Sequence, residues 1–210
     1  NFNPEMGYLK RGNYRKWSGR IFTRFRPENL FGLLEFRPHV NYDGYWKLNG
    51  FQESGRWHID SHWEFRSGFE IHTGTNLTKE GVLEPFEIAP DVFVPAATYD
   101  HQEIAVMIMT NQTKALSFSS HNTIGGFFGG ERINATPTLK FRYSDRFTSQ
   151  FSLSYNNVSL PGGDFVTQMI KARLTYSFSP KMYIQSLLQY NNQSDEWSMN
   201  WRFIWQQSAA

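Results

Sequence analysis

The chain contains no cysteine, and no part of it is continuously apolar over the length of a membrane helix. Without cysteine the protein can have neither a disulfide framework nor a thiolate metal site, and this agrees with an exported bacterial protein. A helix that crosses a bilayer needs about 18 consecutive apolar residues, so a bundle of membrane helices is excluded. The net charge is only +2, which is too small to indicate nucleic acid as a partner.

Aromatic residues, in contrast, are abundant. Phe, Tyr and Trp make up 17% of the 210 residues, although the mean hydropathy of -0.54 is that of a polar chain. A membrane barrel combines these properties, because its strands alternate apolar and polar residues and average out as polar. No segment has a persuasive helical period.

The alternation is clearest over residues 54–77. One set of alternate positions is apolar, interrupted only by Ser61, and consists of Trp57, Ile59, Trp63 and Phe65. The other set is polar and densely charged: Arg56, His58, Asp60, His62, Glu64 and Arg66. After a turn at Ser67 and Gly68 the alternation resumes, which predicts a hairpin with one apolar and one charged face.

Turn signals divide the whole chain into about eleven expected strands. We predict them at 14–26, 31–42, 55–66, 69–78, 100–110, 115–121, 133–144, 147–156, 165–178, 182–190 and 196–206. Short turns alternate with longer connections, expected at 43–54, 78–98, 121–133, 157–164 and 191–195. Most of these strands are long enough to cross a bilayer, which takes about 9–11 residues in a tilted strand.

An apolar strand face can be buried against a second sheet in a sandwich, or against lipid on the outside of a barrel. Three features favour the barrel. Unlike charges crowd the polar faces, Trp and Tyr cluster toward strand ends as in interfacial aromatic girdles, and short turns alternate with long loops. We therefore predict an all-β fold, an antiparallel up-and-down transmembrane β-barrel.

Residues 1–210 are expected to form one outer-membrane β-barrel domain, incomplete and part of a longer protein. A sheet in lipid must close on itself, and bacterial barrels have an even number of strands. Eleven strands do not satisfy that rule, so we expect at least one more strand beyond Ala210.

Several motifs follow one another in an order that we recognise. They are "NPEMGYLKRGNYRKW" at 3–17, "LEPFEIAPDVFVPAATYDH" at 83–101, "GGFFGGER" at 125–132, "VSLPGGDF" at 158–165 and "ARLTYSFSPKMYIQSLLQYNNQSDEWSMNWRFIW" at 172–205. Together they resemble the C-terminal barrel region of bacterial outer-membrane proteins that carry domain of unknown function 5916. In such proteins the barrel usually follows a domain similar to carbohydrate-binding module family 9. The resemblance implies a location in the outer membrane of a Gram-negative bacterium and a link to carbohydrate.

The candidate functional residues are the charged and polar positions expected to line the lumen. They are Arg56, His58, Asp60, His62, Glu64, Arg66, Glu70, His72, Lys140, Arg142, Lys171 and Arg173. We expect no metal site, since residues two apart on a strand lie about 6.5–7 Å apart, too far to share one ion. No catalytic residue and no cofactor are predicted.

Two loops carry aromatic residues that could contact a sugar ring or a partner protein. The segment "LEPFEIAPDVFVP" contains Phe86 and Phe93 and is expected either to fold over the barrel mouth or to pack on its rim. The segment "GGFFGG" contains Phe127 and Phe128, and a plain bulged turn is the alternative reading.

Three functions remain open. The first is transport or surface binding of a polar solute, which the resemblance extends to carbohydrate. The second is a plugged barrel that acts as a scaffold or as a subunit of an outer-membrane complex. The third is an outer-membrane hydrolase that uses lumenal His and carboxylate groups, although no sequence signature of a hydrolase is present. The expected partners are the lipid bilayer of the outer membrane, a polar or carbohydrate ligand, and proteins of such a complex.

Overall fold

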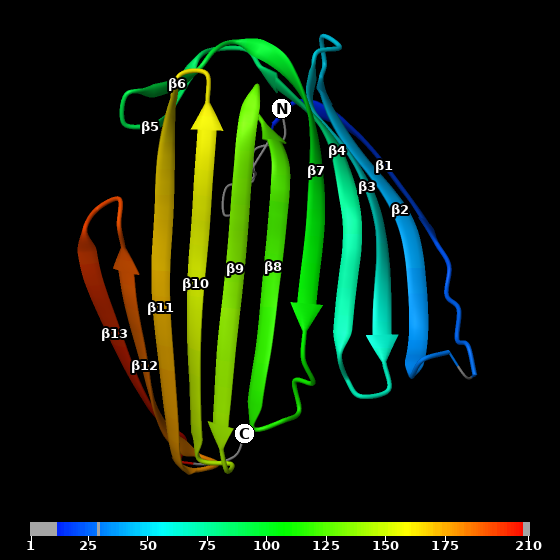
Figure 1. The fold of residues 1–210 in the computed structure, drawn as a ribbon. Coiled ribbons are helices and arrows are strands. Elements are labelled where there is room, and N and C mark those ends of the chain that lie inside the picture. The colour runs from blue at the N-terminus through cyan, green and yellow to red at the C-terminus, as the bar shows by residue number, and fades with distance from the viewer. Residues whose placement is uncertain (1–11, 29, 208–210) are drawn as a thin grey trace.

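The computed structural model describes residues 12–28 and 30–207, and every regular element in these ranges is a β-strand (Figure 1). The strands are β1 (Tyr14–Phe22), β2 (Leu33–Lys47), β3 (Gln52–Phe65), β4 (Glu70–Val82), β5 (Phe86–Ala89), β6 (Val92–Val94), β7 (Ala97–Met109), β8 (Leu116–Phe127), β9 (Gly130–Tyr143), β10 (Phe147–Leu160), β11 (Gly163–Ser179), β12 (Met182–Asn191) and β13 (Glu196–Trp205). No helix capable of spanning a membrane occurs in the described ranges. The first part of the motif at 3–17 lies outside them.

Eleven strands form one antiparallel sheet in the order β1-β2-β3-β4-β7-β8-β9-β10-β11-β12-β13. Apart from the β5–β6 excursion, each strand therefore pairs with the next one along the chain, as in an up-and-down meander. Figure 1 shows this sheet as one continuous curved wall, with β1 and β13 at its two edges. The predicted all-β class and the eleven antiparallel strands are confirmed, whereas no pairing between β1 and β13 closes the sheet within the described residues.

The long connections predicted at one end of the sheet are mostly wrong. The strands simply continue: β8 and β9 are joined only by Phe128 and Gly129, and β10 and β11 only by 161–162. Phe128 has φ 46° and Gly129 φ 81°, the positive angles of a tight two-residue hairpin turn. Glycine-rich and polar residues, which usually indicate loops, lie here within paired strands. Two of the predicted connections are confirmed: the segment between β4 and β7, which contains the separate β5–β6 hairpin, and the connection of β12 to β13 at 192–195.

The two faces of the sheet differ in chemistry, because directly paired residues share a face and neighbours in sequence do not. One row of paired residues is almost wholly aliphatic and crosses seven strands: Ile21, Val40, Ile59, Thr75, Ile104, Ile124 and Ile133. We call this side the apolar face. Its side chains are open to the surroundings, with Ile21 79% exposed, Ile104 60% and Ile124 54%.

The opposite side, which we call the polar face, contains buried charged and polar groups. Glu35, His39, Asp60, Asn76 and Glu103 are each between 4% and 8% exposed. Neighbouring side chains on the same face cover these groups, as the ring contacts of His39 with His58 and His62 show. The arrangement is the reverse of that in a water-soluble domain, where large apolar side chains are buried and charges are exposed.

A small hydrophobic core exists only where the β5–β6 hairpin packs on the sheet, as far as the described residues show. Ala89, Val92 and Val94 of the hairpin meet Val158 and Leu160 of β10. In Figure 1 the hairpin lies at the upper end of the sheet, beside the ends of β10 and β11. Of the two arrangements expected for this segment, the structure thus shows an ordered hairpin that covers one end of the polar face.

Candidate functional site

The structure places eleven of the twelve predicted lumen residues within strands of the large sheet, all on its polar face. Arg56, His58, Asp60, His62 and Glu64 alternate along β3, and their partners on β4 include Glu70 and His72. The remaining four lie at equivalent positions farther along the sheet, namely Lys140, Arg142, Lys171 and Arg173. Arg66 lies just beyond the end of β3, where its Nη2 donates to the carbonyl oxygen of Glu28 at 3.4 Å.

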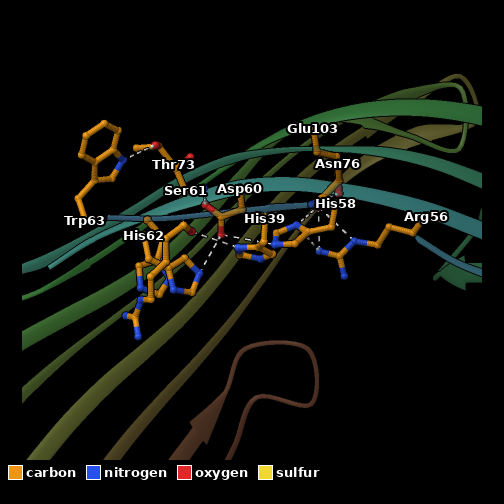
Figure 2. Close-up of polar contacts among 12 residues, drawn as sticks. His39, Arg56, His58, Asp60, Ser61, His62, Trp63, Thr73, Asn76 and Glu103 are labelled. Carbon is orange, nitrogen blue, oxygen red and sulfur yellow. Dashed lines mark hydrogen bonds and ion pairs between the residues drawn. The ribbon is translucent and has the colours of Figure 1, made fainter. Parts of the chain in front are cut away.

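Histidines from three neighbouring strands gather around Asp60. His39 of β2 is the direct cross-strand partner of Asp60, and His72 of β4 is the partner of His62. The Asp60 Oδ2 atom lies 3.4 Å from His58 Nε2 and 3.4 Å from His62 Nε2. Figure 2 shows His58 and His62 pointing toward Asp60 from either side along β3. The prediction of no metal site considered spacing along one strand only, and it overlooked groups that neighbouring strands bring together.

The imidazole rings in this cluster also contact one another. His62 and His72 stack with ring centroids 3.4 Å apart and an interplanar angle of 5°, and His39 meets His62 edge to face at 4.9 Å. Two stacked imidazoles would repel each other if both carried a positive charge. The geometry therefore favours neutral rings, with free nitrogen lone pairs, in at least part of the cluster.

Asn76 fixes the orientation of the neighbouring groups. Its side-chain NH₂ donates to Glu103 Oε2 at 3.4 Å, while its Oδ1 accepts from Arg56 Nη2 at 2.8 Å. The same Oδ1 lies 2.7 Å from His58 Nδ1, and an amide oxygen only accepts, so that nitrogen carries the hydrogen (Figure 2). Glu103 also pairs with Arg132 of β9, which carries the polar network across to β9.

A second network surrounds Glu35, at the other end of the same strands. Its carboxylate lies 3.1 Å from Arg24 Nε, 2.6 Å from Arg26 Nε and 3.3 Å from Arg37 Nε. Arg37 also reaches Glu70 Oε1 at 3.0 Å, and that oxygen contacts His72 Nε2 at 2.6 Å. The carboxylates in this network are therefore already neutralised by arginine.

The polar face is mixed in charge on β2 to β4 and basic on β9 to β11. In the basic part, Lys140 aligns with Gln150 and Arg173, and Lys171 aligns with Ser152. Neither these lysines nor Arg173 forms an ion pair with any residue that the structure describes. This part of the face therefore presents positive charge that the sheet itself does not neutralise.

The loop aromatics mostly contact the protein itself. Phe128 packs edge to face against Phe86, with ring centroids 5.7 Å apart, and against Phe127 at 4.7 Å. Arg132 lies over the ring of Phe127, 4.3 Å from its centroid. Phe93 is 55% exposed and Phe86 39%, so these two of the four predicted loop residues stay open for contact with a ligand.

Several residues of the site were missed at the level of sequence, above all His39, Arg37 and Glu35 of β2. The signal was present, since Glu35, Arg37, His39, Asn41 and Asp43 alternate as regularly as the charged residues of β3. Asn76 and Glu103 were missed because their role depends on contacts between strands.

In comparisons of this chain with protein-family models, with curated proteins and with solved structures, nothing matches. The functional conclusions therefore depend on the geometry of the sheet and its polar face.

Proposed function

We propose that this chain forms part of the wall of an outer-membrane β-barrel, whose polar face lines a lumen that passes or holds a polar, preferentially anionic solute. The observation that supports this most is the sidedness of the sheet. The apolar face exposes its aliphatic row, while Asp60, Asn76 and Glu103 are buried on the opposite face. Lipid is the surrounding that makes such an exposed face favourable.

In water, the exposed apolar face of the sheet would carry a large free-energy cost, and this favours lipid as its surrounding. Apolar surface in contact with water costs about 25 cal/mol per Å², and large apolar patches on soluble proteins are normally covered by a partner. A β-sandwich would need a second sheet against the apolar face. Within the described residues the only other sheet is the short β5–β6 hairpin, and it packs against Val158 and Leu160 on the polar face instead.

Aromatic residues near strand ends agree with a sheet that crosses a lipid bilayer. Tyr14 of β1 contacts Tyr45 of β2 with ring centroids 5.6 Å apart, and Tyr190 contacts Trp197 at 4.9 Å. Tyr and Trp side chains are enriched at lipid headgroup level, because their rings are apolar and their N–H or O–H groups are polar.

Anion preference follows from the basic part of the polar face. Fixed positive charge raises the local concentration of anions at a pore wall. Lys140, Lys171 and Arg173 supply that charge, and no acidic side chain pairs with them among the described residues. A carbohydrate that carries acidic groups would suit the same wall, and it would connect the solute with the resemblance noted above.

Planar-bilayer recordings on the purified protein test this function. We expect conductance with weak anion selectivity at low salt, fading above roughly 0.5 M as the screening length shortens to a few Å. The double variant Lys171→Gln/Arg173→Gln should lose most of the selectivity, while the double variant Lys114→Gln/Lys181→Gln in turns should retain it. Cation selectivity in the unmodified protein would refute the proposal.

A plugged scaffold is the second candidate, and the β5–β6 hairpin favours it. The hairpin forms an ordered apolar cluster over one end of the polar face, with Val94 1% exposed. If the unmodified protein does not conduct and a variant that lacks 84–95 does, the hairpin acts as a plug. The third candidate, a hydrolase that uses lumenal His and carboxylate groups, stays a prediction. His58 and His62 lie beside Asp60, but no Ser or Thr hydroxyl bonds to an imidazole nitrogen within the described ranges.

A further inference from the structure

The histidine cluster on the polar face has the composition and spacing of a metal site. Asp60 is 8% exposed, and its side chain contacts the imidazoles of His58 and His62 and the backbone N–H of Ser61. No Lys or Arg pairs with it in the part of the chain that the structure describes. Buried carboxylates are normally paired with a full positive charge or bound to a metal ion.

The distances around Asp60 fit tetrahedral coordination. In a tetrahedral zinc site with bonds of about 2.0–2.1 Å, neighbouring ligand atoms lie about 3.3–3.4 Å apart. The separation between His62 Nε2 and Asp60 Oδ2 is 3.4 Å. His39, Asp60 and His62 each offer one ligand atom, and these three atoms all lie within 4.8 Å of one another. Only small side-chain movements are needed to bring them onto one ion.

The hydrogen-bonding partners of His39 favour the same role. Its Nδ1 faces the backbone carbonyl of Arg37 at 3.5 Å, and a carbonyl can only accept, so Nδ1 carries the hydrogen and Nε2 has a free lone pair. Histidines that bind metals commonly donate their other ring nitrogen to a carbonyl or carboxylate in this way. His39 is 6% exposed, which holds the ring in place.

We propose that His39, Asp60 and His62 bind a borderline transition-metal dication of the Zn²⁺ class, leaving a fourth position open toward the polar face. Two imidazoles with one carboxylate suit Zn²⁺, Ni²⁺ or Cu²⁺ rather than Mg²⁺ or Ca²⁺, which prefer oxygen ligands. The neighbouring set of His62, Glu70 and His72 also has metal-ligand spacing, but Arg37 already occupies the Glu70 carboxylate. This site does not depend on whether the sheet lies in a membrane.

Zn²⁺ binding to the purified protein in detergent, after removal of metals with a chelator, tests the site. Equilibrium dialysis near pH 7.5 should give one Zn²⁺ per chain. Asp60→Asn, which keeps the side-chain shape, and His62→Ala should each weaken binding more than about 100-fold, since each removes one of three ligands. The control His121→Ala removes an exposed histidine on the polar face of β8 and should leave the affinity unchanged.

A second measurement on the unmodified protein covers the case in which a variant does not fold. Ethoxycarbonylation of individual histidines by diethyl pyrocarbonate, followed by mass spectrometry, should slow at His62 and not at His121 when Zn²⁺ is added. Equal rates with and without Zn²⁺ at His62 would refute the site. So would zinc binding that both Asp60→Asn and His62→Ala leave intact.

Discussion

Replacement of Ile104 by arginine tests the orientation of the sheet most directly. Ile104 lies near the middle of β7 on the apolar face, between Thr75 and Ile124, and is 60% exposed. If this face meets lipid, arginine near the bilayer midplane should lower the free energy of unfolding by about 2–4 kcal/mol. If the face meets water, the same change at an exposed position should shift it by no more than about 0.5 kcal/mol.

The matched control is His121→Arg. His121 is exposed on the neighbouring strand but lies on the polar face, where it pairs with Met107 and Thr136. Arginine there should meet water in the lumen, so we expect a change within about 0.5 kcal/mol. Denaturant titrations of the protein refolded into lipid vesicles give both values under one condition. Equal costs at Ile104 and His121 would refute the assignment of the two faces.

Two further predictions concern the end of the sheet where the hairpin lies. Val94→Ala should destabilise the β5–β6 cluster by about 2 kcal/mol, because it removes buried methyl groups and leaves a cavity. Proteolysis within 83–96 should accelerate in this variant, and an unchanged rate would contradict the packing of the hairpin. Gly129→Val should lower the free energy of unfolding by about 1–2 kcal/mol, because the φ of 81° at this turn position is unfavourable for a β-branched residue. Gly129→Asn should cost less in the same denaturant titration, and equal costs would count against the turn geometry.

Alternation and turn signals were sufficient to predict the eleven strands of the large sheet and its two faces, but not β5 and β6. The charged residues of β3 fall on one face because side chains alternate strictly along a strand, and this holds whatever the strand pairs with. The ends of the strands were harder to predict. Gly125 and Gly126 suggested a loop, yet they lie in β8, where Gly125 at φ 148° lets the backbone pass close to Gln102 of β7. Such close approach depends on the neighbouring strand, so the local sequence does not reveal it.

The candidate site was predictable in composition and not in geometry. The polar residues of β3 could be identified individually, whereas the pairing of His39 with Asp60 depends on the register between β2 and β3. That register includes irregularities near Leu33 and near Tyr45, which shift the alignment by one residue at each place. A shift of one residue reverses which faces meet, so a cross-strand metal site cannot be derived without knowing those positions.

The directions of the edge strands β1 and β13 restrict how the sheet can close on itself. Every neighbouring pair in the eleven-stranded order is antiparallel, so the first and last strands run in the same direction. If β1 and β13 were hydrogen-bonded directly, they would make the only parallel pair in a ring that is otherwise antiparallel. An antiparallel seam instead takes an odd number of additional strands, from this polypeptide or from another molecule. The backbone N–H and C=O groups along both edges are therefore a template for further strands. A strand fits this template only if it has the right direction as well as the right length.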